Sequence, residues 1–192
     1  WIENRMNGYL NKILQTEGED YVIASDTDSI YLNLGPLVTK FLGNKSDDKT
    51  KIVSLLDKIC QDKLEPFIER SYQELASYVQ AYDQKMIMKR ENIAERGIWT
   101  AKKRYILNVW NSEGVQYTEP KLKMMGIEAV KSSTPAPCRT MIKDGLKLMM
   151  NGTEDDVIEF IDKCRTEFKK LPPEEIAFPR SVSDVVKYKS HA

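Results

Sequence analysis

The feature that most constrains this fold is a polar tetrad, Asp26-Thr27-Asp28-Ser29, set between two short apolar runs. The flanking residues, Tyr21 to Ile23 and Ile30 to Leu34, are mostly β-branched or aromatic, a composition typical of strands. Two such strands joined by a short polar segment predict an antiparallel hairpin over residues 21–34. The tetrad then lies where the hairpin reverses, so two carboxylates are expected at the end of a sheet.

The spacing of Asp26 and Asp28 has a chemical meaning, because residues two apart in an extended chain point to the same side. Two carboxylates that close repel each other unless a cation lies between or beside them. Mg²⁺ binds proteins through one or two carboxylates and leaves its other positions to water and substrate phosphates. The pair therefore predicts a magnesium site for phosphoryl transfer. Asp and Ser are also common in turns for their local hydrogen bonds, so a purely structural turn remains the alternative.

Composition limits the possible functions only loosely. The 192 residues, 41% of them hydrophobic, are enough to bury a core, and the 29 basic and 29 acidic residues balance. Net charge therefore gives no argument for a nucleic-acid partner, and only local clusters could. Cys60, Cys138 and Cys164 fit neither a disulfide framework nor a zinc site, and we expect buried thiols in a reducing cytosol. No apolar run approaches the roughly twenty residues of a membrane span, and no leader is seen.

Periodicity predicts the remaining elements. Apolar residues recur at helical spacing over residues 1–15 and 52–79, with Pro66 expected to kink or split the second helix. Strands are predicted by composition and alternation, and we expect them to join the acidic hairpin in one sheet. Their ranges are 86–93, 98–100, 104–110 and 115–118. Residues 43–50 read as a loop, and His191, the single histidine, is assigned no catalytic part.

Beyond residue 130 the pattern changes to helices. One is predicted to begin near Pro135 and to run to Gly152, and a second is predicted to be capped by Thr153 and to end before Pro172. The predicted fold class is therefore α+β. An antiparallel sheet backed by helices occupies residues 1–130, and a mainly helical part occupies residues 131–192.

Basic residues cluster at three places after the hairpin: Lys102-Lys103-Arg104-Tyr105, Lys121-Leu122-Lys123 and Lys131-Ser132-Ser133-Thr134. Lysine and arginine neutralise phosphates and release counterions, while an interleaved aromatic ring offers a flat contact. These clusters predict contacts with a nucleic-acid backbone. Solubility or protection of a strand edge is the alternative for any one of them.

Together these motifs resemble family B DNA polymerases. Asp26-Thr27-Asp28-Ser29-Ile30-Tyr31 resembles the C motif of the family, and Lys102-Lys103-Arg104-Tyr105 resembles the Lys-Lys-x-Tyr motif that grips the primer end. The stretch from Lys121 to Glu128, which runs into Ser132-Ser133-Thr134-Pro135, resembles the passage from palm to thumb. Residues 1–12 and 107–110 resemble the replicative polymerases of T-even-like bacteriophages in particular. The resemblance implies a palm over residues 1–130 and the start of a thumb over residues 131–192.

The resemblance also implies roles at the metal site. Two Mg²⁺ ions would assist attack of a primer 3′-hydroxyl on a deoxynucleoside triphosphate (dNTP). Asp28 would be the principal ligand and Asp26 a less critical one, with Thr27 and Ser29 as auxiliary residues. Glu91 would be an auxiliary acid on the adjacent strand, or else a salt-bridge partner.

The implied DNA-binding residues are Lys102, Lys103, Arg104, Tyr105, Lys121 and Lys123. Lys103 and Tyr105 would contact the minor groove or backbone at the primer end, and Lys102, Lys121 and Lys123 would contact phosphates. The chain departs from the family pattern at Ser25, where glycine is usual, and at Lys89, where close relatives tend to carry an acid.

The chain begins at Trp1, inside a predicted helix, so we expect it to be a piece of a longer protein. The other metal-binding Asp of the family, its triphosphate-binding helix and its exonuclease domain are expected upstream of Trp1. The implied partners are primer-template DNA, dNTP, this upstream half and a sliding clamp, without a membrane. The implied location is the cytoplasm of an infected bacterial host.

Two other functions stay open. A catalytically inactive DNA-binding or assembly module would keep the palm fold and the basic clusters. A different nucleotidyl transferase, such as a cyclase or a reverse transcriptase, would also use a paired-Asp hairpin, although the two lysine-rich motifs argue against it.

Overall fold

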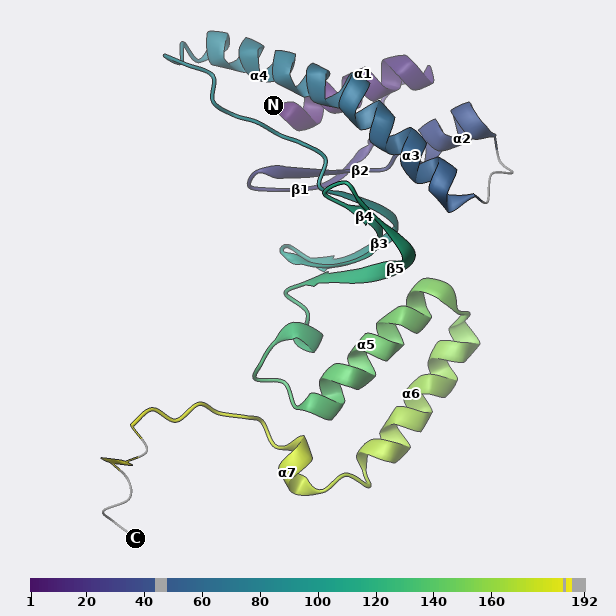
Figure 1. The fold of residues 1–192 in the computed structure, drawn as a ribbon, viewed down its shortest axis with the longest axis vertical. Coiled ribbons are helices and arrows are strands. Elements are labelled where there is room, and N and C mark those ends of the chain that lie inside the picture. Colours follow the sequence, from purple (N-terminus) through teal and green to yellow (C-terminus); the bar gives the residue numbers. More distant parts are fainter. Residues whose placement is uncertain (44–47, 185, 188–192) are drawn as a thin grey trace. The chain divides into compact units, whose positions relative to one another are not determined.

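The computed structural model describes residues 1–43, 48–184 and 186–187 (Figure 1). Its helices and antiparallel sheets confirm the α+β class. Residues 44–47 of the predicted loop, and His191, lie outside the described residues. The elements in chain order are α1 (Ile2–Leu14), β1 (Val22–Asp26), β2 (Ser29–Leu32), α2 (Gly35–Leu42), α3 (Lys49–Ile59), a π-helical segment (Cys60–Leu64), α4 (Glu65–Tyr78), β3 (Asn92–Ala101), β4 (Arg104–Ser112), β5 (Val115–Met125), a 3₁₀ turn (Glu128–Val130), α5 (Ala136–Asn151), α6 (Glu154–Phe168) and α7 (Pro173–Ile176).

The chain forms two compact units that alternate along the sequence. The first comprises Trp1–Glu95 and Val109–Lys121, and the second comprises Arg96–Asn108 and the chain from Leu122 onward. Each of the strands β3, β4 and β5 therefore contributes residues to both units. The division into palm and thumb at residue 130 stays a prediction.

The first unit has a core made by α1, α2, the β1–β2 hairpin and the long helical stretch of α3 and α4. Its fully buried side chains include Met6 and Leu10, both on one face of the predicted helix over residues 1–15, which is confirmed as α1. The other buried members are Tyr21, Val22, Leu37, Val53, Leu56, Cys60, Leu64, Ile68, Tyr72 and Ile93.

The long helical stretch is interrupted as the sequence predicted, and the interruption is a π-helical segment. Pro66 lies in the first turn of α4, directly after this segment. Proline has no N–H and its ring collides with the carbonyl four residues back, so a regular α-helix cannot continue through it unchanged. The wider π turn ends where Glu65 N–H reaches the Cys60 carbonyl.

The predicted single sheet is wrong. β1 and β2 form a two-stranded antiparallel sheet of their own, and β3, β4 and β5 form a separate three-stranded sheet in that order. The predicted strands at 98–100, 104–110 and 115–118 are present, but they are parts of the longer β3, β4 and β5.

The predicted strand over residues 86–93 is also wrong, because β3 begins only at Asn92. Side chains take the backbone groups that a strand ladder would use. The amide side chain of Gln84 hydrogen-bonds both the N–H and the carbonyl of Met86, and Glu65 Oε1 accepts from Arg90 N at 3.1 Å. Residues 85–91 therefore form an irregular segment that hydrogen-bonds Gln84 and Glu65 of α4.

The second unit packs α5 beside α6 (Figure 1). A Cβ at Gly145 would lie 3.1 Å from the Phe160 ring, so glycine lets the two helices approach closely. Arg96 donates to the Met150 carbonyl at 2.7 Å and so satisfies an orphan group of the last turn of α5. The buried residues of this unit's core are Ile106, Ile127, Ala129 and Met150. Both predicted helices after residue 130 are confirmed, and Thr153 forms a capping box with Asp156.

The cysteines are all free thiols, but only Cys60 is buried, whereas Cys138 and Cys164 are half-buried. Burial raises the pKa of Cys60 to about 11, although nearby Arg90 opposes the shift. Among the described residues, no helix has both the length and the apolar character needed to span a bilayer.

Candidate functional site

The acidic tetrad lies at the reversal of the hairpin, as the sequence predicted. Asp26 ends β1 and pairs with Ser29, which begins β2, so Thr27 and Asp28 form a two-residue turn. Thr27 has a positive φ of 48°. The turn is held by Asp26, whose carbonyl accepts from Asp28 N at 2.6 Å and from Ser29 Oγ at 3.1 Å. Thr27 Oγ1 donates to Asp26 Oδ1 at 3.1 Å.

The two acids differ in environment. Asp26 is half-buried at the strand end, and Asp28 is exposed in the turn. The alternation of an extended chain, used to predict that the carboxylates share one side, applies to Asp26 but not to Asp28, because the turn sets the direction of Asp28 instead. Both carboxylates still belong to one four-residue stretch at the end of the hairpin.

The other end of the hairpin is fixed to α1. Asn7 Oδ1 accepts from both Tyr21 N and Val22 N, each at 2.9 Å. Tyr21 also pairs through its hydroxyl with Thr16 Oγ1 at 2.8 Å, and its carbonyl accepts from Asn33 N at 2.8 Å. One end is thus anchored by side-chain and backbone hydrogen bonds, and the acidic turn is presented to solvent at the other.

The donor set at this turn fits a hard cation only in part. Carboxylate oxygens are the ligands that Mg²⁺ prefers, and Asp26 and Asp28 supply two such groups. Over residues 1–43, 48–184 and 186–187, however, no cluster of three or more His, Cys, Asp or Glu side chains is arranged to hold a metal ion. A magnesium ion at this turn would therefore need further oxygens from substrate, water or another segment.

The basic motif Lys102-Lys103-Arg104-Tyr105 divides into two parts. Lys102 and Lys103 form the exposed turn between β3 and β4, and Lys103 has a φ of 60°. Arg104 is turned toward Glu128, with Nη2 donating to Oε1 at 2.8 Å and to Oε2 at 2.6 Å. Tyr105 is 6% exposed, and its ring centroid lies 6.4 Å from that of Trp99. The motif therefore has two exposed lysines, an arginine paired with Glu128 and a buried tyrosine.

The other predicted lysines lie on or after β5. Lys121 is exposed, and its Nζ lies 4.1 Å from the centroid of the Tyr117 ring in a cation–π contact. Lys123 is half-buried. Lys131 is bound to Glu128 Oε1 at 3.2 Å.

Glu91 was predicted on a strand beside the hairpin, and this placement is wrong. It is exposed and precedes β3, and its carbonyl accepts from Glu113 N at 2.6 Å and from Arg90 Nη1 at 3.1 Å. Its carboxylate accepts from Asn92 Nδ2 at 3.3 Å. Glu91 belongs to the same unit as the acidic hairpin.

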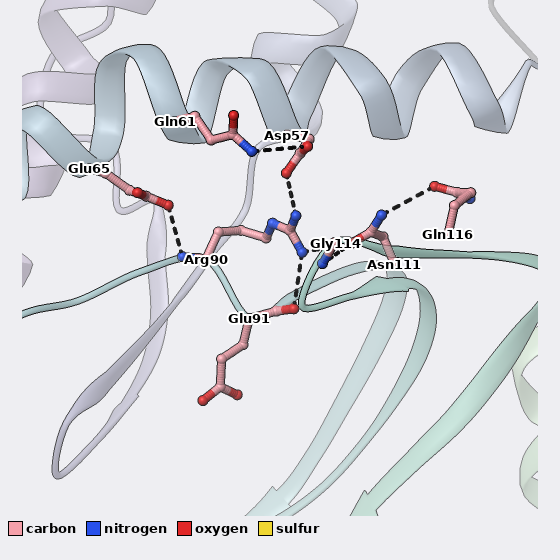
Figure 2. Close-up of polar contacts among 8 residues, drawn as sticks. All are labelled: Asp57, Gln61, Glu65, Arg90, Glu91, Asn111, Gly114 and Gln116. Carbon is pink, nitrogen blue, oxygen red and sulfur yellow. Dashed lines mark hydrogen bonds and ion pairs between the residues drawn. The ribbon is translucent and has the colours of Figure 1, made fainter.

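Next to Glu91 lies a polar cluster that the sequence did not reveal, centred on Arg90 (Figure 2). The Arg90 side chain is 9% exposed; it forms an ion pair with Asp57 of α3 and donates to Asn111 Oδ1 at 2.6 Å. Asn111 also accepts from Gly114 N at 3.2 Å, so the β4–β5 turn is held by the same amide. We call Asp57, Arg90 and Asn111 the Arg90 cluster. It ties the segment before β3 to α3 and to the β4–β5 turn.

Two further residues near the basic motif, Glu128 and Gly126, were not predicted from the sequence as site residues. Glu128 is the partner of Arg104, and the pKa of its carboxyl is lowered to about 2, chiefly by the hydrogen bond from Arg104. Gly126 has a φ of 65° and lies against the Lys103 carbonyl. The signal available for Gly126 was its residue type alone, because glycine often marks a close approach of two backbone segments.

The chain is similar to two phage proteins that are each named DNA-directed DNA polymerase. It is 39% identical to the protein of Escherichia phage RB69 and 32% identical to that of Enterobacteria phage T4, each over 196 aligned positions and 98% of this chain. The chain spans 22% of the length of each relative. No protein-family model matches it. The resemblance to the polymerases of T4-like phages, predicted from the motifs, is confirmed.

Proposed function

Because this chain matches one segment of the DNA polymerases of T4-like phages along nearly its whole length, we propose that it supplies the acidic hairpin and part of the DNA grip of a template-directed DNA polymerase. The reaction is nucleotidyl transfer. The primer 3′-hydroxyl gives up its proton to solvent and its oxygen forms a bond to the α-phosphorus of a dNTP, while the bond from that phosphorus to the bridging oxygen breaks and pyrophosphate leaves. In this proposal the reaction takes place in the cytoplasm of the infected host.

The observation that carries the proposal is the exposed Asp28, on a two-residue turn whose hairpin is anchored to α1 at its other end. Such a support fixes the position of a carboxylate without covering it. In the proposal Asp28 is the principal magnesium ligand and Asp26 the less critical one. Bound Mg²⁺ would neutralise charge on the attacking and leaving oxygens. Thr27 and Ser29 keep the turn closed through their hydrogen bonds to Asp26.

The remaining ligands are assigned to polymerase segments beyond the 22% that the chain spans. Two carboxylates on one turn are too few to fix two cations, and the relatives are far longer than this chain. An upstream palm and fingers segment would complete the site and hold the triphosphate. Glu91 stays in the proposal only as an auxiliary acid from the segment before β3.

Lys102, Lys103, Lys121 and Lys123 are proposed to contact the phosphates of primer-template DNA. Neutralising phosphates releases counterions, so the contacts should make binding salt-dependent. Arg104 and Tyr105 take a different part from the one predicted from the sequence. Arg104 is bound to Glu128, and Tyr105 is buried beside Trp99. In the proposal both residues therefore support the turn formed by Lys102 and Lys103, the lysine turn, without contacting DNA themselves.

The first test is a chimera in which this chain replaces the aligned segment of the RB69 phage polymerase, assayed for primer extension with Mg²⁺. Asp28→Asn should lower the extension rate by about a thousandfold, since charge stabilisation by a catalytic metal is worth several kcal/mol. Asp26→Asn should lower it by only about tenfold.

Glu113→Gln is the matched control, because Glu113 is another acid in a two-residue hairpin turn, with a φ of 50°. Its extension rate should stay within about twofold of the unsubstituted chimera. Unchanged extension by Asp28→Asn would remove Asp28 from its role. A chimera that binds primer-template DNA but extends nothing would favour the inactive DNA-binding module.

A further inference from the structure

Gly126, at the end of β5, makes a close backbone approach to the Lys102–Lys103 turn. A Cβ at this position would lie 2.4 Å from the Lys103 carbonyl oxygen and 3.1 Å from Arg104 Cγ. Its φ of 65° is a left-handed conformation that side-chain-bearing residues rarely adopt. Two independent reasons therefore require glycine here, and one of them is contact with the lysine turn itself.

Two residues later, Glu128 holds the same turn through Arg104. Arg104 Nη2 lies 2.8 Å and 2.6 Å from the two carboxylate oxygens of Glu128, and Lys131 Nζ lies 3.2 Å from Oε1. The Arg104 and Glu128 side chains are 38% and 44% exposed. At that exposure the pair adds little to global stability, so its geometric effect matters more than its energy.

The residues beside these contacts are fixed in the core. Ile127 and Ala129 are 6% and 1% exposed, and they pack in the same cluster as Ile106 of β4. Gly126 and Glu128 are therefore carried by a segment that cannot shift without disturbing buried side chains. We call Gly126–Glu128 the brace.

We propose that the brace is a positioning element that holds the Lys102–Lys103 turn in the geometry in which its two ammonium groups contact DNA phosphates. The inference rests on the proposed function and deepens it, because it names residues that act on DNA only through the lysines. Gly126 sets the path of the Lys103 backbone. Glu128 sets the direction in which the chain leaves the turn at Arg104.

The first experiment compares Gly126→Ala with Gly114→Ala in the chain of residues 1–192. Gly114, in the β4–β5 turn, also has a positive φ of 87°, but a Cβ there would meet nothing within 4 Å. Affinity for a primer-template duplex is measured by fluorescence anisotropy across a salt series. Gly126→Ala should lower the affinity about tenfold and reduce the salt slope by about one to two, the loss of one or two phosphate contacts. Gly114→Ala should leave the slope unchanged.

The second experiment asks whether removing the negative charge of Glu128 strengthens or weakens DNA binding. Glu128→Gln removes a negative charge close to the lysine turn, and simple electrostatics would therefore make DNA binding tighter. If Glu128 positions the lysine turn, Glu128→Gln should instead weaken DNA binding and reduce the salt slope. Arg104→Met should weaken binding as well, and the double variant should lose no more than the larger single loss, because both substitutions break one contact. Tighter binding by Glu128→Gln overturns the brace.

These outcomes separate the brace from the proposed function. In the RB69 chimera, Gly126→Ala should raise the KM for primer-template DNA about tenfold and leave kcat within about twofold, a split that general destabilisation does not give. Suppose that the chimera extends primers and that Gly126→Ala changes neither the KM for primer-template DNA nor the salt slope of DNA binding. The positioning role of the brace is then wrong, and the polymerase proposal stands. If the unsubstituted chain shows no salt-dependent DNA binding and the chimera no extension, the polymerase proposal fails and the brace fails with it.

Discussion

At the scale of single residues, the ion pair of Glu128 makes its carboxyl a test of the structure. Its pKa is lowered from the ordinary 4.5 to about 2, first by the hydrogen bond from Arg104 and then by those from its own backbone and from Lys131. A carboxyl group whose pKa is lowered by folding stabilises the folded state at pH values above its pKa in the unfolded chain. That contribution is lost as the pH falls from about 4.5 through about 2.

We therefore expect the Glu128 carboxyl to titrate near pH 2 when it is followed by NMR in the folded chain. In an Arg104→Met variant its midpoint should move up toward 4.5, because the largest cause of the shift is gone. An unchanged midpoint in that variant would show that Arg104 is not the partner.

Arg90 is a second residue for which a large effect is expected. It is the most enclosed charged group of the Arg90 cluster (Figure 2), and its removal leaves Asp57 without its ion pair. Truncating one partner of a buried pair costs about 3–5 kcal/mol, and Asp57 is 30% exposed, so we expect Arg90→Met to lie at the low end, about 3 kcal/mol. Urea unfolding followed by tryptophan fluorescence measures the loss.

The control for Arg90 is Arg165→Met. Arg165 and Asp162 form a helix-surface pair with side chains 73% and 68% exposed, and pairs of this kind contribute about 0.3–0.5 kcal/mol. Equal losses in the two variants would mean that the Arg90 cluster does not hold the segment before β3 in place.

At the scale of elements, α6 depends strongly on its first turn. None of its side chains is fully buried, so packing contributes less than it does in α1 or α4. Its N-terminus is held by the capping box of Thr153 and Asp156, with Thr153 Oγ1 accepting from Asp156 N at 3.3 Å. Hydrogen bonds from Thr153 also lower the pKa of Asp156.

Thr153→Ala should therefore lower the free energy of unfolding by about 1 kcal/mol, the usual cost of losing an N-cap side chain. Thr140→Ala is the control, because Thr140 is an exposed threonine inside α5 whose hydroxyl donates to the Ala136 carbonyl at 3.3 Å. Alanine is the better helix former, so this variant should be neutral or slightly more stable. Circular dichroism during thermal unfolding reports both changes.

The elements also show how far local sequence carries a prediction. α1, α5 and α6 were predicted because their apolar spacing and caps are local signals. α2 was not predicted, because Gly35 and Pro36, two residues that usually interrupt regular structure, lie in its first turn. Proline in that position starts a helix without losing a hydrogen bond. The false strand over residues 86–93 has suitable residues, but Glu65 and Gln84 take backbone groups that the strand would need.

The candidate site was predictable to a similar degree. The hairpin turn of Asp26 and Asp28 and the exposed Lys102–Lys103 turn follow from short-range patterns. The burial of Tyr105 and the pairing of Arg104 with Glu128 do not, because both depend on residues that are distant in sequence. The prediction that all strands form one sheet was wrong for the same reason, because the pairing of strands also depends on residues that are distant in sequence.

At the scale of the whole molecule, the chain passes three times between its two compact units: after Glu95, after Asn108 and after Lys121. The acidic hairpin and the Arg90 cluster belong to the first unit, and the lysine turn with its brace belongs to the second. The residues of each unit are therefore drawn from segments separated in the sequence.

Because the two units alternate along the sequence, they restrict where recombination can occur within the gene without mixing residues of both units. A single recombination joint anywhere between codons 96 and 121 would give each unit a mixture of parental residues, because both units take segments from either side of the joint. Related phages that exchange DNA in this interval should therefore inherit it as one block. Hybrid genes with joints inside it should be under-represented among viable recombinants relative to joints placed within the α5–α6 coding region.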